Sequence, residues 1–172
     1  SEMCIRDRDD PPTATFERPE NLTIKNCTIN GRMRIGGMSN TYLVPSSKDQ
    51  DHTQRAQDAA PKNITIENST INKNADAVWL YFGSGVTYSK LINSKMTGGT
   101  PGSSPGIYLD AESAYNEISG NSLIAKLNER EQIAVDGSAF NTIKNNIIHV
   151  HLGGGILLYR NCGDCLLYTS PS

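Results

Sequence analysis

Asn21-Leu-Thr-Ile-Lys-Asn-Cys-Thr-Ile29 returns 42 residues later in the chain as Asn63-Ile-Thr-Ile-Glu-Asn-Ser-Thr-Ile71. Both copies place two apolar residues five positions apart. The relaxed pattern occurs at Ile24/Ile29, Ile66/Ile71, Leu91/Met96, Ile118/Leu123 and Ile143/Ile148, with successive steps of 42, 25, 27 and 25. A unit of about 25 residues is therefore repeated along the chain, which is the sequence signature of a repeat protein.

Two positions after its first apolar residue, each unit has Asn or Gly, which tolerate tight or left-handed turns. These residues are Asn26, Asn68, Asn93, Gly120 and Asn145. A second apolar series runs in phase with the first: Met33/Ile35, Val78/Leu80, Ile107/Leu109, Ile133/Val135 and Ile156/Leu158. Its alternation predicts short, half-buried strands. Since no helical periodicity separates the strands, we expect an all-β solenoid in which equivalent residues stack on one another.

The composition gives no support for two classes of partner, nucleic acid and membranes. The chain has 172 residues, 37% of them hydrophobic and 20% charged, with a formal net charge of -2. This charge balance gives no reason to expect binding to nucleic acid or to a charged membrane surface. No apolar run approaches the roughly 18 residues that a transmembrane helix needs, so we expect no membrane span.

The first and last eight residues are related at the DNA level. Ser1 to Arg8 can be encoded by a string whose reverse complement encodes the residues from Cys165 onward. One DNA element in inverted orientation at both ends resembles the mosaic-end adapter of transposon-based sequencing libraries. We therefore expect residues 1–8 and 165–172 to be translated sequencing adapter and not protein sequence. Residues 9–164 would be a solenoid fragment of about five coils, truncated at both ends, and Arg8 and Asp164 would be junction codons.

The first step of the repeat is longer than the others, which places an insertion at about residues 37–60. Its part from Ser46 to Ala60 is polar and rich in Ala and Gln, so the second half is able to form a short helix. We interpret the insertion as a solvated excursion. The alternative is an arm over a binding face, because long loops of solenoids often lie on the functional side.

The repeat resembles the right-handed parallel β-helix superfamily, whose members include pectate lyases, polygalacturonases, alginate epimerases and phage tailspikes. More narrowly, three stretches are similar to a bacterial group of uncharacterised β-helix repeat proteins: residues 106–113, 133–139 and 158–163. The resemblance implies an all-β, right-handed parallel β-helix. It also implies an extracellular or periplasmic location, because proteins of this fold are usually exported. The narrower similarity to the uncharacterised group carries no reaction, since function depends on sites placed on a fold.

Alignment of the second series predicts which outward residues are neighbours, because equivalent residues of a parallel solenoid lie about 4.8 Å apart. One column reads Arg34, Trp79, Tyr108, Ala134 and Leu157, and the next reads Gly36, Tyr81, Asp110, Asp136 and Tyr159. We predict that the four aromatic residues bind substrate as an exposed patch: Trp79, Tyr81, Tyr108 and Tyr159. Flat aromatic surfaces suit sugar rings, although exposed aromatic residues also simply favour strands.

Asp110 and Asp136 are stacked in this alignment, and like charges directly opposite each other destabilise a sheet unless something compensates. We expect the compensation to be a bound cation, a shared proton or a cationic neighbour such as Arg160. The alternative is that both carboxylates cap the following turns through backbone N–H groups.

The resemblance extends to chemistry. In β-helix lyases, carboxylates hold Ca²⁺ and a Lys or Arg removes a proton; in hydrolases of this fold, two carboxylates act as acid and base. It thus implies catalytic roles for Asp110, Asp136 and Arg160, with Glu131 in support and the two Asp residues as Ca²⁺ ligands. The motifs of polygalacturonases are absent, and no acidic triplet matches the lyase calcium site. Glu131 has a simpler interpretation as a solvated turn acid paired with Arg130.

Two classes of function follow. The first is a polysaccharide lyase, epimerase or hydrolase that acts on acidic glycans at the Asp110–Asp136 face. The second is a non-catalytic carbohydrate-binding or structural β-helix, such as a tailspike-like protein or a cell-surface adhesin. Both have a polysaccharide or glycan as partner, and only the first requires the acidic residues for turnover.

Overall fold

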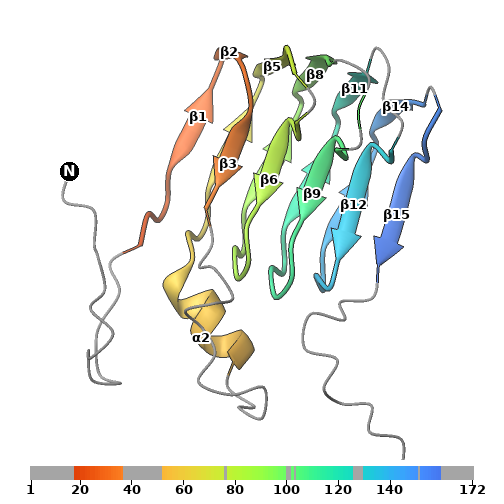
Figure 1. Ribbon diagram of the computed structural model, residues 1–172. Coiled ribbons are helices and arrows are strands. Elements are labelled where there is room, and N and C mark those ends of the chain that lie inside the picture. The colour runs from red at the N-terminus through yellow and green to blue at the C-terminus, as the bar shows by residue number, and fades with distance from the viewer. Residues whose placement is uncertain are drawn as a thin grey trace, which may run out of the picture.

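The computed structural model describes residues 18–36, 52–75, 77–99, 102, 104–125, 130–150 and 152–159. The described strands form three parallel sheets of five strands each (Figure 1). The first sheet contains β1 (Thr23–Lys25), β4 (Thr65–Glu67), β7 (Lys90–Ile92), β10 (Glu117–Ser119) and β13 (Thr142–Lys144). The second contains β2 (Thr28–Asn30), β5 (Thr70–Lys73), β8 (Lys95–Gly98), β11 (Ser122–Ala125) and β14 (Ile147–His149). The third contains β3 (Met33–Ile35), β6 (Leu80–Phe82), β9 (Ile107–Leu109), β12 (Ile133–Asp136) and β15 (Ile156–Tyr159).

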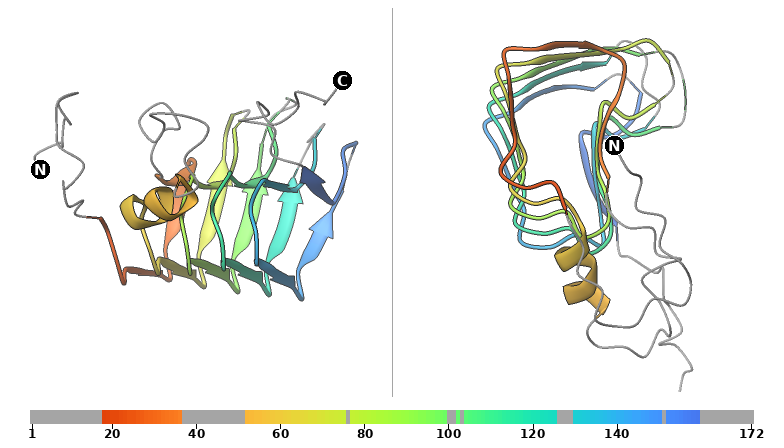
Figure 2. Two further views of the ribbon diagram at one scale, coloured as in Figure 1. Left: turned by 90° about the horizontal axis from the view of Figure 1, so that it is seen from below. Right: turned by 90° about the vertical axis from the view of Figure 1, so that its left-hand side faces the viewer.

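Each coil contributes one strand to every sheet, so five successive coils stack along one axis (Figure 2). The first apolar series is in register as the repeat predicts. In the first sheet Ile24, Ile66, Leu91, Ile118 and Ile143 are paired in turn. In the second, Ile29, Ile71, Met96, Leu123 and Ile148 are paired in the same way. The prediction of an all-β parallel solenoid of about five coils is confirmed.

The turn between the first and second sheets has the predicted left-handed conformation. Its φ angles are 57° at Asn26, 47° at Asn68, 48° at Asn93, 66° at Gly120 and 55° at Asn145. Asn and Gly occupy this conformation at low cost, whereas most residue types do not. The recurrence of these two types therefore fixes where each coil bends.

Polar ladders support the same corner from inside the solenoid. The amide side chain of Asn121 accepts a hydrogen bond from the backbone N–H of Ser94 (2.8 Å) and donates one to the carbonyl of Leu91 (2.9 Å). The backbone N–H of Asn121 donates to the side chain of Asn146 at 2.9 Å. These buried groups are thus paired between coils, as polar groups in an interior must be.

The predicted register of the second coil in the third sheet was wrong by two residues. Leu80 pairs with Met33 and Ile107, and Phe82 pairs with Ile35 and Leu109, whereas the prediction placed Val78 and Leu80 at these positions.

The side chain of Trp79 explains the shift. Trp79 is fully buried, and its indole Nε1–H donates to the carbonyl of Thr97 at 2.7 Å. A Cβ on Gly106 would lie 2.6 Å from this ring, so the glycine makes room for it. Tyr81 therefore takes the outward position that the prediction gave to Trp79.

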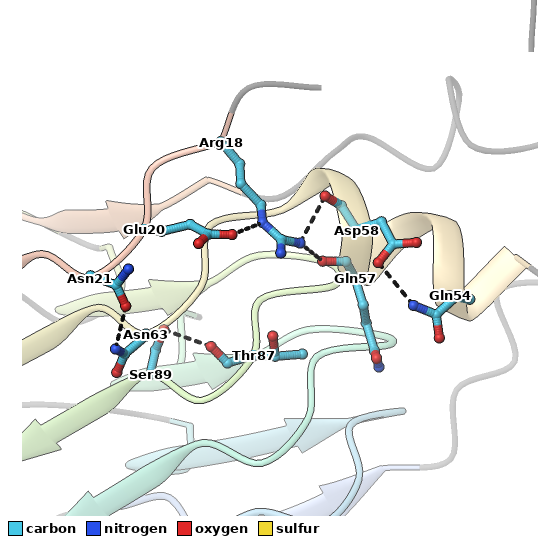
Figure 3. A network of polar contacts seen from close by, with 9 residues as sticks. All are labelled: Arg18, Glu20, Asn21, Gln54, Gln57, Asp58, Asn63, Thr87 and Ser89. Carbon is cyan, nitrogen blue, oxygen red and sulfur yellow. Dashed lines mark hydrogen bonds and ion pairs between the residues drawn. The ribbon is translucent and has the colours of Figure 1, made fainter. Parts of the chain in front are cut away.

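The predicted short helix is present as α2 (His52–Ala59). The helix lies at one corner of the coil cross-section (Figure 2). Arg18 bonds the carbonyl oxygens of Gln57 and Asp58 at 2.6 and 2.8 Å (Figure 3). A cation next to the C-terminal carbonyl groups of a helix interacts favourably with the helix dipole. No helix in the described ranges is long and apolar enough to cross a membrane.

Residues 37–51 of the insertion and both proposed adapter segments lie outside the described residues. The expectation that the ends are artefactual therefore stays a prediction.

Candidate functional site

The outer face of the third sheet carries a row of polar and aromatic side chains, and the corrected register gives its members. One column runs through Arg34, Tyr81, Tyr108, Ala134 and Leu157. The rings of Tyr81 and Tyr108 are parallel, with centroids 5.5 Å apart and an interplanar angle of 7°. The guanidinium of Arg34 covers the Tyr81 ring at 4.6 Å. Both faces of the Tyr81 ring are thus occupied, whereas the contacts of the Tyr108 ring cover one of its faces.

Asp110 lies at the end of β9, where the chain leaves the third sheet. Its carboxylate accepts hydrogen bonds from the hydroxyl of Tyr81, from the hydroxyl of Ser84 at 3.0 Å and from the backbone N–H of Ala111 at 2.9 Å. The last bond is the turn-capping contact that we gave as the alternative role of this residue. Three donors thus fix the orientation of this carboxylate.

Asp136 occupies the equivalent place at the end of β12 and accepts a hydrogen bond from the hydroxyl of Tyr108. Each tyrosine thus reaches from its own coil to the carboxylate of the next coil. The stacked carboxylates are therefore compensated by tyrosine hydroxyls, a source that the sequence analysis did not consider. A bound cation or a shared proton is not needed to explain their proximity.

The two tyrosines are held in their protonated form. Burial is the first cause that raises the pKa of Tyr81, followed by its hydrogen bond to Asp110 and the charge of that carboxylate. Burial and the hydrogen bond to Asp136 raise the pKa of Tyr108 in the same way. A phenolate here would lose a hydrogen bond and face a carboxylate. Neither tyrosine is thus suited to act as a base near neutral pH.

Arg130 extends the row at the far end of the sheet. Its guanidinium donates to the Glu131 carboxylate at 2.6 and 3.2 Å, and to the hydroxyl of Tyr159 at 3.3 Å. The bond to Tyr159 and the pairing with Glu131 raise the pKa of Arg130. Glu131 is only 2% exposed, so the interpretation as a solvated turn acid was wrong, although its pairing with Arg130 is present.

The structure does not bring all the predicted site residues together. It places Tyr81, Tyr108, Asp110, Asp136 and Tyr159 along the outer face of the third sheet. Glu131 is buried beneath Arg130 instead of facing outward. The prediction that Trp79 is part of an exposed patch was wrong, because the residue is fully buried. Arg160 lies outside the described residues.

The donor set does not fit Ca²⁺. This ion takes six to eight oxygen ligands, usually several carboxylates among them. In the described ranges, no group of three or more His, Cys, Asp and Glu side chains is placed to hold a metal ion. The Asp110 and Asp136 carboxylates also each accept a tyrosine hydroxyl. Asp110 and Asp136 alone are thus too few ligands for a calcium ion.

Sequence reasoning missed an aromatic cluster at the corner between the third and first sheets, which we call the turn stack: Tyr88, Tyr115 and Phe140. Tyr115 stacks on Tyr88 with centroids 5.1 Å apart and on Phe140 at 5.0 Å. A signal existed, because Asn21, Asn63 and these three residues follow the same steps of 42, 25, 27 and 25. This column was not among the two that we predicted.

The model of one protein family, described as right-handed beta helix region, matches residues 16–170. Comparisons with curated proteins and with solved structures found no match. The family match covers all the described strands, and the three parallel sheets agree with it. The chain therefore belongs to the right-handed β-helix family.

Proposed function

We propose that the outer face of the third sheet binds an acidic glycan. The observation that carries the proposal is the ladder in which Tyr81 bonds Asp110 and Tyr108 bonds Asp136 on successive coils. The ladder repeats hydroxyl and carboxylate groups at the spacing of the coils, about 4.8 Å. A polysaccharide presents hydroxyl groups repeatedly along its length, so a repeated row of donors and acceptors suits it.

Two cations stand at opposite ends of the row, with the two carboxylates between them, and are the groups that would bind an acidic ligand. Arg34 lies on β3, the first strand of the sheet, and is exposed. Arg130 contacts Tyr159 on β15, the last strand. An arginine presents a planar fork that matches a carboxylate, such as that of a uronic acid. We infer that the two guanidinium groups hold sugar carboxylates while the ladder between them bonds sugar hydroxyls.

Calorimetric titration with oligogalacturonate and alginate oligosaccharides tests this proposal. Arg34→Ala and Arg130→Ala should each weaken binding about tenfold, the value of one hydrogen bond to a charged group. Arg32→Ala is the matched control, because Arg32 lies on the same coil but lines a hollow beside Lys73 instead of the row. No binding by the wild type, or an equal loss in the control, would show that the face is not an acidic-glycan site.

Catalysis on the bound glycan is a second candidate, favoured by one difference between the two carboxylates. Asp110 accepts three hydrogen bonds, whereas the described contacts of Asp136 include one, through Oδ2. Asp136 is thus better placed than Asp110 to exchange a proton with a substrate.

Chromatography of oligosaccharides after long incubation tests for cleavage. If the face is catalytic, the wild type shortens the chains and Asp136→Asn abolishes this more completely than Asp110→Asn. Intact oligosaccharides with wild-type protein that still binds them would leave binding as the function and reject catalysis.

A further inference from the structure

The charges on the outer face of the third sheet are distributed unevenly along the solenoid axis. Arg34 lies on β3 in the first coil. Asp110 follows β9 in the third coil, and Asp136 ends β12 in the fourth (Figure 1). Arg130 reaches the hydroxyl of Tyr159 on the last strand, β15. The two ends of the row are therefore cationic, whereas its middle is anionic.

The two carboxylates in the middle of the row are held by neutral groups. Their hydrogen-bond donors are the hydroxyls of two tyrosines and one serine and a single backbone N–H. The ion pairs within the described part of the chain involve other acids: Glu20, Glu67, Glu117 and Glu131. A neutral donor orients a carboxylate but leaves its negative charge in place. The middle of the row therefore keeps two negative charges that no described cation balances.

The two negative charges act on the same part of the face. Asp110 and Asp136 belong to adjacent coils, which lie about 4.8 Å apart. Burial raises the pKa of Tyr108 most, followed by its hydrogen bond to Asp136 and the charges of Asp136 and Asp110. The Tyr108 ring thus lies in the field of both carboxylates. A ligand group above the third and fourth coils would lie in the same field.

Charged and neutral sugars differ in how they suit this field. A uronate over the middle of the row would place a third negative charge beside two others, and like charges at an interface strongly oppose binding. A neutral sugar brings hydroxyl groups, which donate hydrogen bonds to carboxylate oxygens. Asp136 is half-buried and accepts the Tyr108 hydroxyl through Oδ2, which leaves Oδ1 to accept such a bond.

We propose that Asp110 and Asp136 select a glycan whose uronates are separated by at least two neutral sugars. The inference rests on the acidic-glycan face proposed above and names the class of glycan that this face binds. One uronate lies at Arg34 and another at Arg130, while the sugars over the third and fourth coils are uncharged. A pyranose residue is comparable in length to the coil step of about 4.8 Å, so each carboxylate faces about one sugar. A polyuronate binds more weakly, because its middle residues meet like charges.

Calorimetry with two octasaccharides tests the inference. Deacylated gellan octasaccharide has three neutral sugars between its glucuronates, whereas octagalacturonate has a carboxylate on every sugar. The wild type should bind the gellan octasaccharide at least about tenfold more tightly than octagalacturonate. High salt should reduce this preference, because it screens the repulsion between the ligand and the two Asp side chains.

The double variant Asp110→Asn/Asp136→Asn should bind octagalacturonate about tenfold more tightly than the wild type and lose the preference. Each single variant should give an intermediate result. The amide oxygen of Asn still accepts a tyrosine hydroxyl, so the ladder should persist. Glu67→Gln/Glu117→Gln is the matched control, because it removes two negative charges from the outer face of the first sheet. This control should keep the preference of the wild type.

The outcomes separate this inference from the function on which it rests. Equal affinity of the wild type for the two octasaccharides would overturn the inference and leave the acidic-glycan face in place. A preference that survives in the Asp double variant, or that disappears equally in the first-sheet control, would also overturn it. Binding of neither octasaccharide would instead contradict the acidic-glycan face itself, and the inference with it.

Discussion

At the scale of single residues, the main feature of the outer face of the third sheet is a set of hydrogen bonds from tyrosine hydroxyls to aspartate carboxylates on the next coil. Tyr81 and Tyr108 each fix an Asp side chain that would otherwise face a like charge on the neighbouring coil. A hydrogen bond to an ionised group stabilises a fold by about 1.5–3 kcal/mol, which is more than one between neutral groups contributes. The outer face is thus preorganised, which lowers the cost of ordering side chains when a ligand binds.

The raised pKa values of Tyr81 and Tyr108 give a pH prediction. Because the folded-state pKa exceeds the unfolded value of about 10, the stabilisation is fully present below pH 10 and is lost as pH rises beyond it. Absorbance titration of phenolate should show two tyrosines ionising later than the others. In the double variant Tyr81→Phe/Tyr108→Phe, this late phase should disappear while the phase near pH 10 persists. Loss of the earlier phase instead would contradict the assignment.

Left-handed aromatic residues at the turn stack are the second feature at this scale. A bulky residue in this conformation costs on the order of 1–3 kcal/mol, and an aromatic pair returns about 0.5–1.5 kcal/mol beyond its buried area. Three such residues cost about 3–9 kcal/mol, whereas their two stacked pairs return about 1–3 kcal/mol. Stacking therefore offsets only part of the backbone strain.

Polar ladders connect the elements, and Asn121 tests their contribution. Asn121→Ala would remove the acceptor of the Ser94 N–H and one donor to the carbonyl of Leu91, which also lies in the parallel pairing of β7 with β10. We expect a loss of about 1–3 kcal/mol in the free energy of unfolding, the cost of one buried polar group left unpaired.

Asn121→Ser is the matched variant for this ladder, since Ser69 and Ser94 accept the equivalent backbone N–H bonds in the preceding coils. It should retain more stability than the alanine variant in urea unfolding. Equal losses in the two variants would mean that the ladder bonds do not determine the effect.

Gly85 controls how α2 attaches to the solenoid. Its φ is 80°, and a Cβ would lie 2.2 Å from the carbonyl oxygen of Ala56. Gly85→Ala should therefore displace α2 and lower the free energy of unfolding by about 2 kcal/mol. Gly36→Ala is the control, because a Cβ there meets nothing within 4 Å. Helix displacement can be followed by proteolysis within His52–Ala59, and an unchanged cleavage rate would contradict the packing.

The sequence predicted the elements better than their register. The first apolar series was correct in every coil because Asn or Gly marks its turn each time. In the second coil, Val78, Trp79, Leu80, Tyr81 and Phe82 are all apolar or aromatic. A period of two then fits two registers that differ by two residues.

The choice between these two registers depends on a contact that the alternation of apolar residues cannot reveal. Trp79 enters the interior because Gly106 on the next coil has no side chain. For the same reason the aromatic patch was predicted with one wrong member, while Tyr108 and both Asp residues were placed on the correct face. The tyrosine–carboxylate bonds depend on side-chain reach between coils, which a list of outward columns does not contain.

Stability should vary along the axis of the whole molecule. The interior residues of the middle coils are fully buried, including Leu91, Met96 and Ile107, whereas all four residues of β15 are exposed. In a solenoid each coil is stabilised mainly by its neighbours. Hydrogen exchange should therefore be slowest in β7 to β12 and fastest in β1 and β15. Uniform protection across the five coils would contradict this gradient.

The face proposed to bind an acidic glycan extends over several coils, so the ligand should be sensed by strands that are distant in the sequence. Amide chemical shifts during titration with an acidic oligosaccharide provide the most direct test. We predict shifts that follow the third sheet, at β3, β6, β9 and β12 and at Arg130. Shifts confined to the first or second sheet, or no shifts at all, would contradict the proposal that the Tyr81–Asp110 and Tyr108–Asp136 ladder is an acidic-glycan site.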